Sequence, residues 1–162
     1  MLSVMISDLK AFTRLLFSDD AFDQFLLHDA NFTTAYTVNV SGILNPEFFE
    51  EDENKPEENC VSWGRFRPVA TDLIKGKKLP VSFRIVLVTS KKSTEALVKR
   101  TGFSGCEVSS LSVNVSYRGK VLTLTTGIAY GGFTLDKSLD RYWDDSVRKF
   151  LDSKGIAYEE QA

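Results

Sequence analysis

The sequence predicts an α+β fold, with antiparallel sheet and about four helices, in a single domain spanning residues 1–162. The clearest observation is segment 108–130, in which apolar residues alternate with Ser, Thr and Asn on both sides of a glycine turn. A second is the 3-4 spacing of apolar residues over 139–151, which is typical of a helix with one buried side. A third is the composition, since 43% hydrophobic and 26% charged residues are usual for a globular domain.

Segment 108–130 is expected to form a hairpin with Arg118-Gly119 as its two-residue loop. That loop pairs Tyr117 with Lys120. The next pairs on the same face are Val115 with Leu122, Val113 with Leu124 and Leu111 with Thr126. The opposite face carries Ser112, Asn114, Ser116, Thr123 and Thr125, interrupted only by Val121. The ribbon therefore has one apolar face for a core and one hydroxyl-rich face for water or a partner.

The first half of the chain predicts two helices and up to four strands. In order, these are a strand at 2–6, a helix at 8–17, two strands within 25–40 that separate near 33–35, a short edge strand from 43 towards 49, and a helix at 63–75. Pro68 is expected in the first turn of the second helix, where its missing N–H is harmless. The intervening segment 50–59 has no apolar residue and is expected to be a flexible surface loop.

The second half predicts the same succession of elements. A strand at 81–89 reads as central and buried on both faces, because its apolar run is nearly continuous. A helix at 91–101, the hairpin, a brief apolar segment at 133–135 and a helix from about 136 to 154 follow, and the tail after Gly155 is expected to fray. Halves 1–80 and 81–155 thus resemble a tandem duplication, although any α+β chain can be divided to look symmetric.

The bulk properties exclude several classes of protein. Two cysteines, Cys60 and Cys106, are too few for a disulfide framework, and no apolar run approaches the ~20 residues of a membrane span. The first residues show no basic leader, so a cytoplasmic location is expected. No cofactor is predicted, because there is no glycine-rich phosphate loop and no metal-ligand spacing.

The only histidine, His28, lies on the apolar phase of its predicted strand. A hydrogen-bonded structural histidine is favoured over a metal ligand. A catalytic arrangement in space with Cys60 or Cys106 stays open. No catalytic residue is predicted, and His28 is the first candidate if an enzyme or ligand pocket exists.

Other polar clusters are better explained by structure than by chemistry. Asp19, Asp20 and Asp23 are favoured as turn residues, and the pair Asp144-Asp145 as a solvated helix face. The run IKGKK at 74–78 follows a helix and lacks a following Ser or Thr, so it predicts a capped helix end rather than a Walker loop.

Charge is distributed unevenly, although the net charge is only −2. Segment 47–58 carries seven acids and one lysine, whereas 63–78 carries five bases and one acid, with Trp63 and Phe66 among them. Interleaved bases and aromatics can bind single-stranded nucleic acid, but a buried position for both aromatics is favoured. The first helix of each half is also basic. Candidate nucleic-acid-binding residues are therefore Lys10, Arg14, Lys91, Lys92, Lys99 and Arg100.

The blocks FDQFLL (22–27), DLIKGKKLPVSF (72–83) and FTLDKSLDRYWDD (133–145) resemble a family of small uncharacterised bacterial proteins. The resemblance covers nearly the whole chain, implies an intracellular bacterial protein, and transfers no functional residue. The tandem strand-helix-three-strand pattern is also similar to one domain of the sliding DNA clamps, which turn basic helices towards DNA. The helices at 63–75 and 136–152 are extra to that pattern.

These observations favour a non-catalytic binding or interaction module. Three hypotheses follow: protein–protein association or self-association through an edge strand or the Ser/Thr face, clamp-like association with nucleic acid, and a ligand-binding protein or enzyme with a pocket near His28. No membrane partner is expected.

Overall fold

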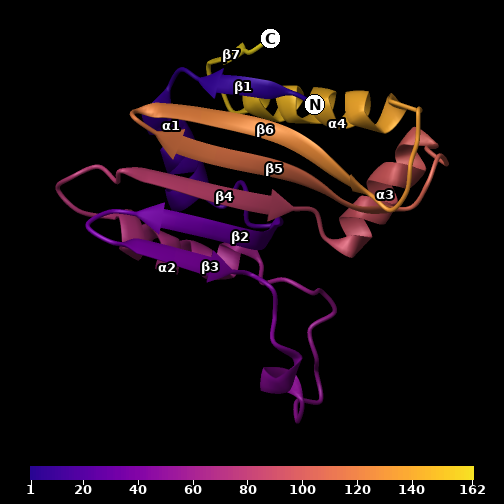
Figure 1. The fold of residues 1–162 in the computed structure, drawn as a ribbon, viewed down its shortest axis with the longest axis horizontal. Coiled ribbons are helices and arrows are strands. Elements are labelled where there is room, and N and C mark those ends of the chain that lie inside the picture. Colours follow the sequence, from indigo (N-terminus) through magenta and orange to yellow (C-terminus); the bar gives the residue numbers. More distant parts are fainter.

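The computed structural model describes residues 1–162 and contains one seven-stranded antiparallel sheet, with strand order β3-β2-β4-β5-β6-β1-β7 (Figure 1). The strands are β1 (Ser3–Ile6), β2 (Leu26–Thr33), β3 (Thr37–Ser41), β4 (Ser82–Val88), β5 (Val108–Arg118), β6 (Val121–Tyr130) and β7 (Tyr158–Glu160). Strand β4 lies between the two hairpins, β2–β3 and β5–β6. The predicted α+β class with antiparallel sheet is confirmed.

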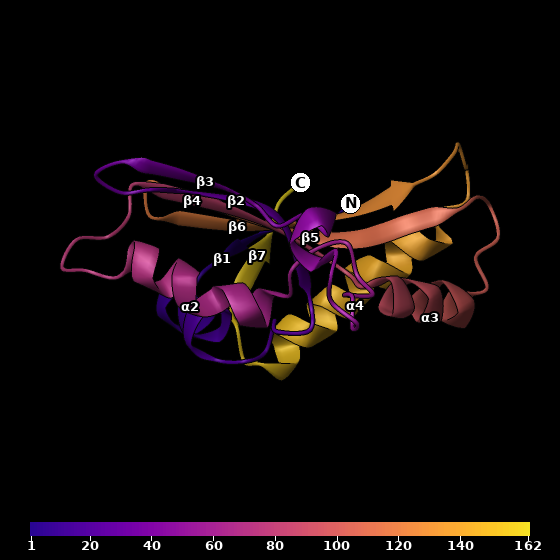
Figure 2. The ribbon, with the colours of Figure 1, turned by 90° about the horizontal axis from the view of Figure 1, so that it is seen from below.

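Four α-helices lie on one face of this sheet and leave the other face uncovered (Figure 2). They are α1 (Leu9–Thr13), α2 (Trp63–Ile74), α3 (Lys91–Thr101) and α4 (Ser138–Ser153), and α1 continues as a π-helical segment, Arg14–Ser18. Short polar side chains begin three of these helices: the side chains of Asp8, Ser62 and Ser90 each accept a hydrogen bond from a backbone N–H in the first turn. None of the helices combines the length and apolarity that a membrane crossing needs.

The expected position of Pro68 in the first turn of α2 was wrong. The helix begins at Trp63, directly after the Ser62 cap, so Pro68 lies five positions further on, in the helix interior. Trp63 fixes this start, because its ring is buried and its indole N–H donates to the carbonyl of Leu16 at 2.9 Å. Burial of the largest side chain of the helix therefore outweighs the single backbone hydrogen bond that Pro68 removes.

The core lies between the sheet and the helices and contains 28 buried residues in one cluster. Phe83, Ile85 and Leu87 of β4 point into this core, whereas Arg84 points to the uncovered face. The predicted interior position of this strand is correct. The predicted burial of both its faces was wrong, because no helix covers the second face.

The hairpin β5–β6 forms with a register two residues away from the predicted one. Its turn is Gly119-Lys120, with φ values of 58° and 66°, and not Arg118-Gly119. Two consecutive residues with positive φ form a type I′ turn, whose twist matches that of the strands. Tyr117 therefore pairs with Leu122. A shift of two residues preserves the side-chain alternation, so the predicted apolar and hydroxyl-rich faces are both correct.

Three predicted short segments differ from the structure. The expected strand from 43 towards 49 is a 3₁₀ turn, Pro46–Phe49, with only one isolated bridge between Ile43 and Cys60, because Pro46 has no N–H to donate to a ladder. Segment 133–135 forms no strand. The tail does not fray: β7 pairs with β1 along the edge of the sheet.

The two halves of the chain show the same order of main elements, β-α-β-β-α, before β7. Their pairing differs, however. Strand β4, the first of the second half, lies inside the sheet beside β2 and β5, whereas β1, the first of the first half, pairs with β6 and β7. The duplication therefore stays a hypothesis based on element order.

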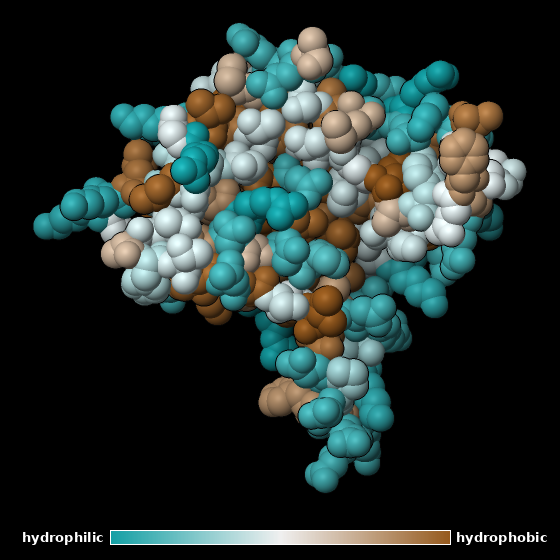
Figure 3. Space-filling view, in the orientation of Figure 1, coloured by the Kyte–Doolittle hydropathy of each residue, from teal (hydrophilic) through white to brown (hydrophobic).

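The uncovered face of the sheet, called the open face below, is mostly polar (Figure 3). Its neighbouring residues across the central strands include Asn31, Arg84, Ser116 and Thr123, which the register places side by side. The face carries no aromatic side chain from these strands. It is a solvated surface without the stacking platforms that single-stranded nucleic acids require.

Candidate functional site

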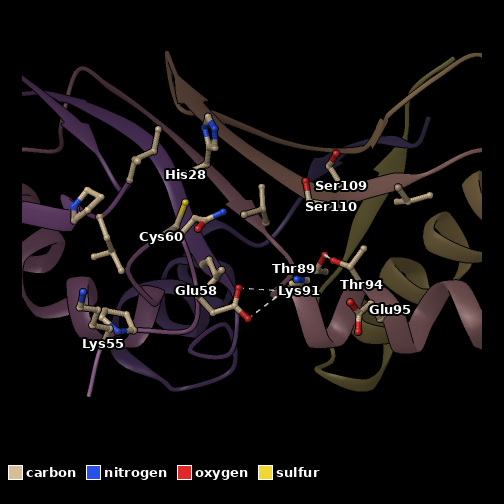
Figure 4. A pocket seen from close by; sticks show the side chains of 18 of the residues that line it. His28, Lys55, Glu58, Cys60, Thr89, Lys91, Thr94, Glu95, Ser109 and Ser110 are labelled. Atoms are coloured by element: carbon tan, nitrogen blue, oxygen red, sulfur yellow. Dashed lines mark hydrogen bonds between the residues drawn. The ribbon is translucent and has the colours of Figure 1, made fainter. Parts of the chain in front are cut away.

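A pocket of about 1010 Å³ lies beside the start of α3. One wall is residues 42–61, called the arm below, which project beyond β3 (Figure 1). The other walls are β2, the junction between β4 and α3, and the first residues of β5. Figure 4 shows residues from these four segments around the pocket, among them His28 and Ser110, with the Glu58 carboxylate directed at Lys91.

Backbone hydrogen bonds at the base of the arm join the segment that leaves the sheet to the segment that returns to it. Leu44 N–H donates to the carbonyl of Asn59, and Val61 N–H donates to the carbonyl of Gly42, both at 2.8 Å. None of residues 42–60 belongs to the hydrophobic core. The arm is thus an appendage attached at its base, where Gly42 and Val61 also hydrogen-bond to β2, and its outer part shapes the pocket.

His28 reaches the pocket because β2 is irregular at this residue. The pairing of β2 with β4 shifts between Leu27 and Asp29, so that Leu26 and Leu27 are both buried and His28 points outward. The expected position of His28 on the apolar side of the strand was therefore wrong. Its side chain is 50% exposed, and its Nδ1 lies 3.6 Å from Asp29 Oδ2.

Cys60 lines the same pocket, whereas Cys106 lies elsewhere, with its Sγ 3.7 Å from the carbonyl of Gly132. Burial, and then the negative charge of Glu58, raise the pKa of the Cys60 thiol above its ordinary value. The thiolate, which is the nucleophilic form, is therefore disfavoured. No hydrogen bond joins Cys60 to His28, so the two residues share a pocket without forming an activated pair.

Glu58 connects the arm to the start of α3. Its carboxylate accepts from the backbone N–H of Lys91, with both oxygens at 3.2 Å (Figure 4). Anions are favoured at this end of a helix, where the backbone N–H groups are unpaired. Behind this contact, Thr89 and Thr94 are buried and their hydroxyls lie 2.6 Å apart. The arm thus closes one side of the pocket by capping the helix.

The six basic residues proposed for nucleic acid fall into two separate groups. Lys10 and Arg14 belong to α1 and its π-helical extension, and the other four belong to α3. All six are exposed. Although α1 and α3 lie on the same side of the sheet, they occupy opposite ends of it (Figures 1 and 2). They do not form one continuous strip for a phosphate backbone, and the nucleic-acid hypothesis stays a prediction.

Three of the other acidic candidates, Asp23, Asp144 and Asp145, have structural partners. Asp23 accepts two hydrogen bonds from Arg67, at 2.9 and 3.0 Å. Asp144 accepts from the hydroxyl of Thr126 at 2.5 Å, and Asp145 pairs with Arg148. No group of three or more His, Cys, Asp or Glu side chains comes together in a way that could hold a metal ion.

Sequence reasoning identified His28 and Cys60 but missed the site that contains them. The bulge in β2 and the path of the arm bring residues together from far apart in the chain, and neither leaves a local pattern. Glu58 was read only as part of an acidic loop, and Ser109 and Ser110 only as strand residues. The one available signal was the position of Cys60 and Val61 directly after the polar segment 50–59, where the chain returns to the sheet.

The fold and the pocket together define an α+β protein that has one open sheet face and a polar pocket at the end of its sheet. The chain belongs to a family of unknown function, DUF5721, whose family model matches residues 14–159. No curated protein and no solved structure matches it. Membership of an uncharacterised family is confirmed, while the bacterial origin and the clamp resemblance stay predictions.

Proposed function

We propose that this protein is a non-catalytic binding module that takes up a small polar molecule in the pocket between the arm and α3. The observation that carries the proposal is that polar side chains from four separate segments line one hollow of about 1010 Å³. A few convergent polar groups within a largely preformed pocket are typical of ligand sites. A cytoplasmic location is part of the proposal.

The lining determines the class of ligand. Lys55 and Lys91 contribute positive charge, Glu58, Glu95 and Glu107 contribute negative charge, and Ser109 and Ser110 contribute hydroxyls. Charges of both signs favour a ligand that carries hydrogen-bond donors as well as acceptors, such as a zwitterion or a polyhydroxyl compound. The raised pKa of Cys60 and the absence of a hydrogen bond between Cys60 and His28 support binding rather than covalent catalysis.

A screen of polar metabolites by thermal unfolding tests the proposal. A ligand at about a hundred times its dissociation constant stabilises a protein by about 2.7 kcal/mol, which raises Tm by roughly 5–10 °C for a chain of this size. Ser109→Trp places a large ring in the pocket and should abolish the shift. Thr123→Trp introduces the same ring on the open face and should leave the shift unchanged.

Two results would contradict the proposal. One is that no compound in a library of amino acids, sugars and nucleosides raises Tm. The other is a set of compounds that stabilise the native chain and Ser109→Trp equally, because such compounds bind elsewhere. His28→Ala tests the contribution of one lining residue, since it should weaken ligand binding without changing the Tm of the free protein.

A further inference from the structure

Unpaired charges of opposite sign occupy two ends of the molecule. Six acids of the arm form no ion pair: Glu47, Glu50, Glu51, Asp52, Glu53 and Glu57. At the other end, called the basic end below, Lys77, Lys78, Arg118 and Lys120 are exposed and also form no ion pair. Surface charges are usually interspersed, so such separation within a chain of net charge −2 is a property that requires explanation.

The topology fixes these two groups far apart. Ser82, the first residue of β4, pairs with Thr33 at the end of β2 and with Arg118 at the end of β5. The start of β4 therefore lies beside the ends of both strands. Loop 75–81 therefore emerges between the turns of the two hairpins, at the left of Figure 1. The arm leaves β3 at the opposite end of that strand. One molecule therefore cannot place its own arm on its own basic end.

Each end also exposes large apolar side chains next to its charges. At the basic end, Leu79 is 71% exposed, Tyr36 is 67% exposed, and Val81 and Val121 are exposed as well. On the arm, Phe48 is 77% exposed and packs edge-on against Phe49. Figure 3 shows hydrophobic side chains beside hydrophilic ones at both places. Exposed apolar side chains that gather in one place with polar groups around them are typical of interaction sites.

We infer that the basic end is a docking surface for the acidic arm of a second copy of this chain. The two surfaces match in charge and each offers exposed apolar side chains for burial. Their union is head-to-tail, because different patches of the two copies meet. Such a contact leaves one arm and one basic end free, so association proceeds to short chains or to a closed ring. Long-range attraction between unpaired charges also makes it sensitive to salt.

Charge reversal tests the contact from both sides. The end-reversed variant carries Lys77→Glu, Lys78→Glu and Arg118→Glu, and the arm-reversed variant carries Glu50→Lys, Glu51→Lys and Glu53→Lys. None of these arm positions lines the pocket, so ligand binding stays intact in both variants. A control with the same change of charge as the end-reversed variant carries Lys92→Glu, Lys99→Glu and Arg141→Glu, which are exposed outside the basic end. Unfolding curves check that all three variants fold.

Sedimentation velocity at low salt measures the outcome. The native chain and the control should sediment as assemblies that dissociate as salt rises, whereas each reversed variant alone should be monomeric, with an apparent dissociation constant raised at least about tenfold. An equal mixture of the two reversed variants should associate again, because its arms and ends are complementary once more. The inference is overturned if the native chain is monomeric at low salt and high concentration, or if the mixture stays monomeric.

A second measurement tests whether the basic end binds nucleic acid instead of a second copy of the chain. Labelled duplex DNA is titrated with native and end-reversed chains at low salt. The inference is overturned if the native chain stays monomeric and binds the DNA, and the end-reversed variant does not bind it. The basic end would then be a site for nucleic acid.

Discussion

At the scale of single residues, the turn of the β5–β6 hairpin shows what a sequence pattern can decide. The alternation of side chains identified both faces of the hairpin, but Arg118-Gly119 and Gly119-Lys120 give the same faces. The choice depends on which residues adopt positive φ, and Lys120 does so at 66° although it is not glycine. His28 illustrates the opposite case, because a one-residue bulge in β2 reverses its side and no local signal marks the bulge.

Gly119→Ala should destabilise the protein through backbone conformation alone. The residue has φ of 58°, and a methyl group there meets no atom within 4 Å, so packing contributes nothing to the result. The left-handed conformation costs an L-residue with a Cβ about 1–2 kcal/mol. Gly132→Ala is the matched control, since its Cβ would meet only an ordinary contact, 3.6 Å from Cys106, without positive φ. Urea unfolding should show the loss for Gly119→Ala only; equal changes in both variants would contradict the assignment of the turn.

At the scale of elements, the best predictions were the helices with a clear apolar stripe. Helix α4 was expected from the spacing of residues such as Leu139, Trp143 and Val147, and all three are buried. Periodicity works here because a helix buries one stripe whatever lies opposite. It failed for β7 and for the segment after Ile43, since pairing at a sheet edge depends on which strand lies nearby, and β1 is more than 150 residues from β7 in sequence.

A hydrogen bond joins helix α4 to β6. It should make the free energy of unfolding vary with pH in the alkaline range. The hydroxyl of Tyr130 donates to Asp140 Oδ2 at 2.6 Å. Burial, then this hydrogen bond and the charge of Asp140, raise the pKa of Tyr130 well above its ordinary value of about 10. Above about pH 10 the unfolded chain therefore loses the phenolic proton before the folded one does, and stability falls as pH rises.

Tyr130→Phe should cost about 0.5–1.5 kcal/mol at pH 8, because it removes the hydrogen bond to Asp140. The difference between the native protein and this variant should shrink as pH rises above about 10, since only the native protein loses the contribution of Tyr130. Urea unfolding at several pH values measures both effects. Tyr36→Phe is the control, because that side chain is exposed and makes no side-chain hydrogen bond. A constant difference across the pH range would contradict the argument.

At the scale of the whole molecule, the sequence predicted the secondary-structure elements better than their arrangement in space. The α+β class, the hairpins and the helices follow from local patterns. The strand order does not, because it depends on β4 entering between two hairpins that are separate in sequence. The pocket depends in turn on that order and on the arm. The candidate site was therefore beyond local reasoning, although two of its residues, His28 and Cys60, had been singled out by type.

The division between a stable body and an appended arm gives a prediction for the entire chain. Residues 42–60 contribute nothing to the core of 28 residues, and the base of the arm already pairs Leu44 with Asn59. Replacement of residues 45–58 by Asn-Gly, a sequence that favours a tight hairpin turn, should therefore leave the fold intact. The only hydrogen bond between the replaced residues and the body of the fold is the cap of Glu58 on Lys91, an exposed interaction that contributes about 0.3–1 kcal/mol.

The expected decrease in Tm is accordingly no more than about 4 °C, because 1 kcal/mol corresponds to roughly 2–4 °C in a chain of this size. Hydrogen exchange should show unchanged protection in β5 and β6, which form the longest strand pair of the sheet. The same variant lacks one wall of the pocket and the whole acidic surface, so it should neither bind the pocket ligand nor self-associate. A large loss of stability would show that the arm belongs to the body of the fold, whereas a stable variant that still assembles would place the self-association surface elsewhere.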